Sequence, residues 1–356
     1  MKHYAFAIGV YAVLFVTGCL AQPAFPYMYP YPKAKITLHI VNQNNQPVTD
    51  TEIEASFAYC NHNLCKWPDE NGYVTFESDA VTDVLFINQN YKQDAHIEKK
   101  QYYRTTIRKK FHTPSQNVKN GKWQPWNPTI TMILKEKINP IPMYAAEKNR
   151  IKLPKINAWI GFDMEKNAWL APYGKGEVAD IEVYHQWDGS FGTNYKGSIL
   201  KIRFPGEYAG CYTFDYEHNI ENFSCDFRSP YNAIPENQYI QEISFLDVLK
   251  NTNSSLDKNK ITGICSEYLT KRVGYIFRTR TKVDEQGNLI SARYGKIYPS
   301  SGLLFKVWKN QESILHLHYY LNPTENDTNL EYDPNQNLLM EKVNPKDRWK
   351  YMNIAP

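Results

Sequence analysis

The sequence lacks the short motifs that mark the common enzyme classes. It has no Gly-x-Ser-x-Gly nucleophile elbow, no His-Glu-x-x-His zinc motif, no phosphate-binding loop and no Gly-x-Gly-x-x-Gly dinucleotide motif. A strong excess of charge is also missing, because 41 basic and 37 acidic side chains leave a net charge of only +4. A charge this small and dispersed gives no reason to expect a nucleic-acid partner. We also expect no cofactor.

Long apolar runs are absent except at the N-terminus. The run from Ala5 to Val16 follows Lys2 and His3. It is too short to cross a bilayer as a helix, and it has the length of a signal-peptide core. Residues 1–18 are therefore predicted to be a signal peptide, and the protein is predicted to be exported.

The apolar run ends in Val16-Thr17-Gly18-Cys19, which resembles the lipobox of uncharacterised exported bacterial lipoproteins. The resemblance implies that Cys19 becomes the first residue of the mature chain and carries a diacylglycerol and a palmitate. It implies a lipoprotein of the cell envelope, held in the outer membrane and facing the periplasm or the exterior. The alternative is cleavage after Ala21 and simple secretion, since Cys19-Leu20-Ala21 also has small residues at the needed spacing.

Cysteine is scarce, with six residues in the chain and no Cys-x-x-Cys spacing that would indicate a metal site. In an exported protein we expect such cysteines to form disulfides. We predict the pairs Cys60–Cys65 and Cys211–Cys225, each closing a short loop, with Cys265 left over. The odd number that remains after lipidation means that one thiol is free or that the lipidation prediction is wrong.

Proline marks the organisation of the chain. Residues 19–33 alternate proline with aromatic residues, a composition typical of a semi-rigid tether. Residues 128–134 alternate as a closing strand does, and Asn139-Pro140-Ile141-Pro142 then interrupts the ladder because proline has no N–H. We therefore predict a first domain at 34–138, a linker at 139–149 that acts as a hinge with few contacts across it, and a larger domain at 150–356.

The alternation of apolar and polar residues in the first domain predicts about seven strands and a small Ig-like β-sandwich. The turns Gln46-Pro47-Val48 and Asp69-Glu70-Asn71-Gly72-Tyr73 are similar to those of carboxypeptidase regulatory-like (transthyretin-like) domains. This resemblance covers residues 35–137 and implies a structural module without catalytic residues. The basic run at 98–110 could meet anionic headgroups or lipopolysaccharide phosphates beside the anchor, but we favour an edge strand, where lysines prevent pairing with other chains.

The second domain also alternates over most of its length. The turn Asp284–Gly287 predicts a hairpin, and its first strand, 273–283, is predicted to have one buried and one solvent-exposed face. A short helix is predicted around 240–249. The fold class is therefore all-β, with an antiparallel, β-rich second domain that is a sandwich or an open barrel. The predicted strands lie at 196–204, 212–216, 273–283, 288–298, 303–308 and 313–321.

Two kinds of candidate chemical site remain. His316 and His318 share one face of a predicted strand at a spacing that can chelate zinc or copper, but no third ligand is evident and we expect no metal. Carboxylates two residues apart form the acidic pairs that a glycosidase would need in a cleft, although on strands we expect such pairs to be solvated. The acidic pairs are Asp180/Glu182, Asp215/Glu217 and Glu331/Asp333.

Aromatic residues gather at the start of the second domain. Exposed rings of this kind can stack on sugars, whereas most aromatic side chains lie in protein cores. The four candidate glycan-binding residues are Trp159, Trp169, Tyr173 and Trp187. Tyr184 lies in the same aromatic-rich stretch.

The predicted signal peptide, the composition and the missing enzyme motifs together favour a non-enzymatic, lipid-anchored cell-envelope protein with a binding or scaffolding role. Its expected partners are the membrane, reached through the lipid, and an envelope protein or glycan. One alternative is a glycan-binding module that uses the Trp- and Tyr-rich loops. The other is an envelope glycan hydrolase that uses one of the acidic pairs.

Overall fold

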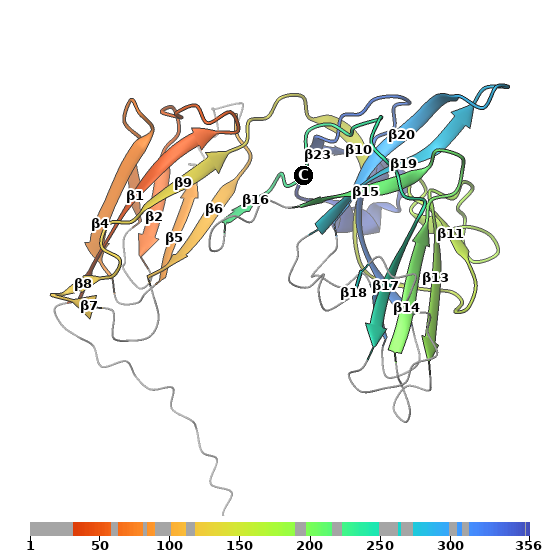
Figure 1. The fold of residues 1–356 in the computed structure, drawn as a ribbon, viewed down its shortest axis with the longest axis horizontal. Helices are drawn as coiled ribbons and strands as arrows, with labels where there is room; N and C mark the ends of the chain where they lie inside the picture. Colours follow the sequence, from red (N-terminus) through yellow and green to blue (C-terminus); the bar gives the residue numbers. More distant parts are fainter. Residues whose placement is uncertain are drawn as a thin grey trace, which may run out of the picture.

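The computed structural model describes residues 31–57, 63–80, 84–89, 101–111, 118–188, 197–215, 223–248, 263–264, 273–298, 305–307, 313–352 and 354–356. The described chain is built of β-strands that form four sheets, which confirms the predicted all-β class. The four sheets make two sandwiches that lie side by side (Figure 1). No helix in this part of the chain is long and apolar enough to cross a membrane.

The N-terminal sandwich packs two five-stranded sheets around one core. Its strands alternate as the sequence predicts, so that Ile36, Leu38 and Ile40 of β1 are buried between the sheets. Sheet 1 has the order β4 (Tyr73–Asp79), β1 (Lys33–Asn42), β8 (Lys122–Trp123) and β7 (Val118–Lys119), with β9 (Thr129–Leu134) parallel to β1. Sheet 2 has the order β16 (Phe223–Cys225), β6 (Thr105–Lys110), β5 (Val84–Gln89), β2 (Ile53–Phe57) and β3 (Leu64–Lys66).

The turn between β3 and β4 forms as predicted. Asp69 Oδ1 accepts hydrogen bonds from the backbone N–H groups of Asn71 and Tyr73, at 3.0 and 2.8 Å. Gly72 has a φ of 80°, and a Cβ at this position would lie 2.5 Å from the carbonyl oxygen of Ile40. Only glycine fits this turn, because both the backbone angle and the close approach exclude a side chain.

The C-terminal sandwich packs a seven-stranded sheet on a six-stranded one. Sheet 3 has the order β15 (Gly210–Asp215), β19 (Val273–Val283), β20 (Leu289–Tyr298), β22 (Ser313–Leu321), β10 (Ile141–Lys152) and β23 (Tyr332–Asn337), with β21 (Phe305–Val307) beside β22. Sheet 4 has the order β12 (Ala168–Trp169), β11 (Ile160–Asp163), β13 (Ile181–Asp188), β14 (Gly197–Arg203), β17 (Glu242–Val248) and β18 (Gly263–Ile264). The chain ends in α2 (Leu339–Lys342) and the 3₁₀ helix η3 (Pro345–Tyr351).

Three sequence-based predictions about this half are wrong. Most of the linker predicted at 139–149 belongs to β10, which lies between β22 and β23 in sheet 3. The helix predicted around 240–249 is strand β17, paired with β14. The face of β19 predicted to be solvent-exposed is buried at Ile276 and Arg278, where a layer of loops covers the second face of sheet 3, and is exposed as predicted only at Lys282. That layer includes Ala233, Leu330 and Ile354.

A strand of the C-terminal half completes a sheet of the N-terminal half. β16 pairs antiparallel with β6, and Cys225 lies opposite Thr105. In Figure 1, β16 lies between the two sandwiches, beside β6. The basic run that includes β6 was predicted to be a sheet edge, but along residues 105–107 the strand β16 covers that edge.

Candidate functional sites

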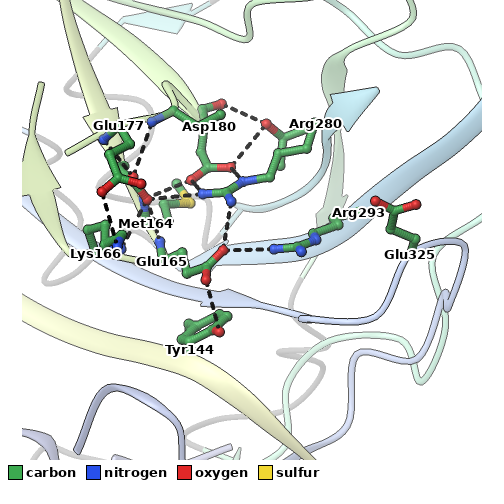
Figure 2. A network of polar contacts seen from close by, with 12 residues as sticks. Tyr144, Met164, Glu165, Lys166, Glu177, Asp180, Arg280, Arg293 and Glu325 are labelled. Atoms are coloured by element: carbon green, nitrogen blue, oxygen red, sulfur yellow. Dashed lines mark hydrogen bonds and ion pairs between the residues drawn. The ribbon is translucent and has the colours of Figure 1, made fainter. Parts of the chain in front are cut away.

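The densest group of charged side chains surrounds Arg280 in the C-terminal sandwich (Figure 2). The register of β19 against β20 shifts between Thr279 and Lys282, and Arg280 has a φ of 52°. This irregularity turns two consecutive side chains towards Asp180. Thr279 and Arg280 both donate hydrogen bonds to its Oδ1, at 3.3 and 2.8 Å. A β-bulge that redirects a side chain in this way costs backbone energy, which the new contacts must offset.

Arg280 contacts three carboxylates. Its guanidinium donates to both oxygens of Asp180, at 2.8 and 2.9 Å, to Asp163 at 3.0 Å and to Glu165 at 2.7 Å. Asp180 is completely buried and Asp163 almost so, at 0% and 1% exposed. Buried carboxylates are stable only when they are paired and hydrogen-bonded, so the guanidinium is what allows these two to be buried.

Glu165 joins this group to the end of the chain. Its carboxylate accepts hydrogen bonds from Arg280, from Arg293 of β20 at 2.9 Å and from Lys342 of α2 at 2.9 Å. Burial would raise the pKa of Glu165, but the hydrogen bonds from Lys342 and Arg293 outweigh it and lower that pKa to about 2. The carboxylate is therefore ionised throughout the neutral range and fixed by three cations.

These contacts define the Arg280 cluster, in which three carboxylates (Asp163, Glu165, Asp180) balance three cations (Arg280, Arg293, Lys342). Asp163 Oδ1 also accepts the backbone N–H of Lys166, and its Oδ2 accepts that of Glu177, so the same carboxylate ties its own loop together. A general acid or base must be able to exchange a proton with a substrate. The cluster instead holds the 163–180 loop on sheet 3, and we assign it a structural role.

Within the described residues, two of the three predicted acidic pairs are seen, and the carboxylates of neither pair face each other; Asp180 and Glu331 are buried and not solvated as expected. Asp180 points into the Arg280 cluster, whereas Glu182 accepts a hydrogen bond of 2.8 Å from Arg203 on β14. Glu331 is buried, and Asp333 accepts hydrogen bonds from Asn335 and Gln336 in its own loop. The third pair, Asp215/Glu217, extends beyond the residues that the structure describes.

The four candidate glycan-binding aromatics do not form one platform. Trp169 is buried in the core against Phe162, with ring centroids 5.1 Å apart. Tyr173 is exposed on the loop that follows β12. Trp187 shares a face of β13 with the buried His185 and contacts its ring edge-on. Trp159 contacts Tyr184 and so lies at the opposite face of the same strand.

The ring of Trp159 is already occupied on one side. The guanidinium carbon of Arg203 lies 4.4 Å from its centroid, and Glu182 holds that guanidinium in place. A cation over an indole is a favourable contact in its own right. A sugar would therefore have to use the other side of the ring or displace Arg203.

A serine and a histidine meet in the core of the C-terminal sandwich. His185 Nδ1 of β13 lies 2.6 Å from Ser313 Oγ of β22, and the two residues are 1% and 3% exposed. Burial lowers the pKa of His185 to about 4, so the imidazole is neutral at pH 7. A nucleophilic serine has to reach its substrate, and here both partners lie between two sheets, so we assign the pair to packing.

The two histidines of the proposed metal pair share a face of β22 as predicted. His318 Nε2 lies 2.6 Å from the hydroxyl oxygen of Tyr320, and burial lowers the pKa of His318 to about 3. Within the described residues, no group of three His, Cys, Asp or Glu side chains is arranged to hold a metal ion. His316 and His318 belong to the half-buried second face of sheet 3.

The joint between the sandwiches is a second polar cluster, organised around Glu331. This carboxylate is 1% exposed and accepts hydrogen bonds from the Tyr103 hydroxyl at 2.6 Å and from the backbone N–H groups of Ile138 and Asn139 at 2.9 and 2.7 Å. Burial and this hydrogen bond raise the pKa of Tyr103, so its hydroxyl stays protonated and donates. One side chain from the loop before β23 thus holds both the segment that leads into β6 and the segment that leads from β9 into β10.

Phe227 is the apolar centre of the same joint. Its fully buried ring stacks on Tyr103 at 4.8 Å between centroids and contacts Tyr231 at the same distance. The amine of Lys296 lies 4.6 Å from the Phe227 centroid and donates to Ser229 Oγ at 3.1 Å. Lys296 is 0% exposed, and burial lowers its pKa. We call this set, with Glu331, the interdomain joint.

The structure contradicts one predicted disulfide. Cys211 is buried in the core of the C-terminal sandwich, whereas Cys225 lies on β16 against the N-terminal sandwich, and both are free thiols. They are hydrogen-bonded into different sheets, so they are not joined. For the other predicted pair, Cys65 is exposed on β3 and Cys60 lies outside the described residues, as do Cys19 and Cys265.

We expect both buried thiols to be alkylated when the mature protein is unfolded without a reductant. In the native protein the same two cysteines should resist the reagent, because burial raises the pKa of both thiols and blocks access. Mass spectrometry of the labelled peptides gives the answer. Recovery of a disulfide-linked peptide pair that contains Cys211 and Cys225 would contradict this arrangement.

Sequence reasoning missed the residues that organise both clusters. Arg280 read as one of several polar residues on an exposed face, and Phe227 and Lys296 carried no motif. Glu331 was noticed only as half of an acidic pair. The available signal was local: Glu331 follows Asn329, whose side-chain oxygen accepts the backbone N–H of Glu331, a pattern typical of a constrained turn.

Comparison with known proteins adds little. No protein-family model matches the sequence, and no curated protein does. Among solved structures, the chain is similar to the crystal structure of a DUF3823 family protein from Parabacteroides merdae, with 6% identity over 84% of this chain and 99% of that one. The TM-score is 0.19, which is too low to support an argument about fold or function. The likeness to carboxypeptidase regulatory-like domains therefore remains a resemblance of two turns.

Proposed function

We propose that this protein is a non-enzymatic, lipid-anchored scaffold of the cell envelope, whose two sandwiches act as one rigid unit. The observation that carries the proposal is the interdomain joint. A buried carboxylate, an aromatic stack and a shared strand join the two halves across a segment predicted to be a hinge. Such contacts suit a protein that presents a binding surface at a fixed place and angle, because a flexible connection would not transmit position.

The contacts of the acidic residues argue against the hydrolase alternative. Four of the six residues in the candidate acidic pairs are described with partners, and each holds the fold through an ion pair or a backbone contact. The glycan-binding alternative would need several exposed rings on one face. Trp169 is in the core instead, and Trp187 and Trp159 lie at opposite faces of β13. A scaffold that binds another envelope protein needs neither feature.

The lipid anchor is the part of the proposal that rests on sequence. Val16-Thr17-Gly18-Cys19 supplies the modification site, and the outer membrane is the proposed location. Secretion after cleavage at Ala21 is the competing outcome. The first described residues, from Tyr31 on, lead directly into β1, so the proposed tether would join the N-terminal sandwich at sheet 1.

We expect Cys19→Ala to move the protein from the membrane fraction to the soluble fraction. The physical reason is the loss of the acyl chains, since two or more chains are needed for stable anchoring. Cys65→Ala, which changes an exposed cysteine of β3, is the control and should leave the protein on the membrane. A mature N-terminus at Gln22, found by mass spectrometry in place of acylated Cys19, would show secretion instead.

A further inference from the structure

One end of the N-terminal sandwich is both basic and aromatic. It comprises the hairpin β7–β8, the loop 124–127 and the first described residues of the chain. The backbone N–H of Lys33 donates to the Gly121 carbonyl at 2.8 Å, and that of Ala80 donates to the Pro32 carbonyl at 2.8 Å. In Figure 1 this end is at the lower left, away from the C-terminal sandwich. The proposed tether therefore arrives at this end, which we call the hairpin end.

The hairpin end carries more positive than negative charge. Its described residues include four lysines (Lys33, Lys35, Lys119 and Lys122) and two carboxylates (Glu77 and Asp79). The ammonium groups of Lys33 and Lys35 lie 4.0 and 3.0 Å from Glu77. A hydrogen bond from Lys35, with the charges of Lys35, Lys33 and Lys122, lowers the pKa of Glu77 despite some desolvation. Three cations around one carboxylate leave this surface positive.

Two tryptophans stand among these lysines. Trp123 is half-buried against the core, and its indole N–H donates to the Ala80 carbonyl at 2.9 Å, which fixes the ring. Trp126 is half-buried on the loop 124–127 that follows β8, with the Lys122 amine 4.6 Å and the Lys35 amine 5.9 Å from its ring centroid. Indole rings beside lysines are typical of surfaces that meet the headgroup layer of a bilayer.

We propose that the hairpin end lies on the surface of an anionic phospholipid bilayer. The inference deepens the proposed function and rests on it, because the lipid anchor would deliver this end to the membrane. Residues 19–30 span at most ~40 Å even when fully extended. The lysines are therefore held close enough to touch the headgroups, where each adds about fivefold to the binding constant.

This contact would give the scaffold a fixed orientation. With only a lipid and a tether, the protein could point in any direction. With the hairpin end on the headgroups, the contact is made by the side of the molecule opposite the C-terminal sandwich (Figure 1). The exposed surface of the second sandwich would then face a partner.

The test uses residues 20–356, which contain every described element, with an N-terminal histidine tag bound to nickel-chelating lipid in place of the acyl chains. The protein is held on vesicles of phosphatidylcholine alone or of phosphatidylcholine mixed with phosphatidylglycerol. Amide hydrogen exchange of residues 118–127 is followed by mass spectrometry. We expect this segment to exchange at least about fivefold more slowly on the anionic vesicles, and salt near 1 M to remove the difference, since the Debye length then falls to about 3 Å.

The double variant Lys119→Glu/Lys122→Glu should abolish the slowing. The matched control is Lys155→Glu/Lys175→Glu, which changes the same charge at two exposed lysines of the C-terminal half and should leave it intact. Equal exchange on both kinds of vesicle, or slowing that survives Lys119→Glu/Lys122→Glu, overturns the inference. Because the tag replaces the lipid, this result is independent of whether Cys19 is acylated.

Discussion

Arg280→Ala should lower the free energy of unfolding of the C-terminal sandwich by about 3–5 kcal/mol. The substitution removes the guanidinium that contacts both oxygens of Asp180 and one of Asp163. Both carboxylates are buried, so they would remain charged without their cation or take up protons at a cost. The loop at 163–180 would also lose its attachment to sheet 3.

Chemical denaturation followed by tryptophan fluorescence measures this effect. The matched control is Arg203→Ala, which also breaks an arginine–carboxylate pair, with Glu182, but at a site where the arginine side chain is 42% exposed. An exposed pair of this kind contributes about 1 kcal/mol or less. If Arg280→Ala and Arg203→Ala lower the free energy of unfolding by similar amounts, burial of the Arg280 cluster does not add the stability that we assign to it.

Glu331→Ala should open the interdomain joint. The change leaves the Tyr103 hydroxyl and the N–H groups of Ile138 and Asn139 without their acceptor in a buried place. Unsatisfied buried donors cost about 1–3 kcal/mol each, so even one shifts the ratio of closed to open forms by about 5- to 150-fold. The shared β6–β16 pairing would then be strained as well.

Small-angle X-ray scattering reports the opening as a larger radius of gyration. Limited trypsin digestion reports it as faster cleavage after Lys135 and Lys137, which lie over the rings of Phe227 and Tyr103 in the closed form. The control is Asp333→Ala, two residues away, because the oxygens of Asp333 accept hydrogen bonds from Asn335 and Gln336 in its own loop. If Glu331→Ala scatters and digests like Asp333→Ala, the two sandwiches do not depend on this carboxylate.

The parts of the fold that follow from local pattern could be predicted. Alternation placed β1, β9 and β22 correctly, since a two-residue period needs only neighbouring residues to be recognised. The Asp69–Gly72 turn was equally accessible, because Asp and Gly at that spacing satisfy one backbone geometry. The all-β class followed from these elements.

The parts that depend on distant segments could not be predicted. Proline at 140 and 142 suggested a linker, yet β10 tolerates Pro142, since its parallel pairing with β23 shifts register between Ile141 and Met143. Ile276, on the predicted exposed face of β19, is covered by loops far away in sequence. The bulge at Arg280 reversed the alternation just where the largest ion cluster forms.

The candidate sites failed for a related reason. Acidic residues two apart were expected to share a face, but Asp180 precedes β13 and turns inward, while Glu182 on the strand faces Arg203. A carboxylate can be buried only where a cation reaches it. For Asp180 that cation is Arg280, 100 residues further along the chain. No local pattern contains that information.

The pairing of β6 with β16 has a consequence for the newly made chain. β6 ends at Lys110, but its partner strand begins only at Phe223. At a synthesis rate of about 5–20 residues per second, sheet 2 waits roughly 6–20 s with its last strand missing. During that interval its open backbone groups are a template for strands of other nascent chains. While residues 111–222 are being synthesised, a chaperone that covers the open edge of sheet 2, or slow export, would therefore have its largest effect on the yield of folded protein.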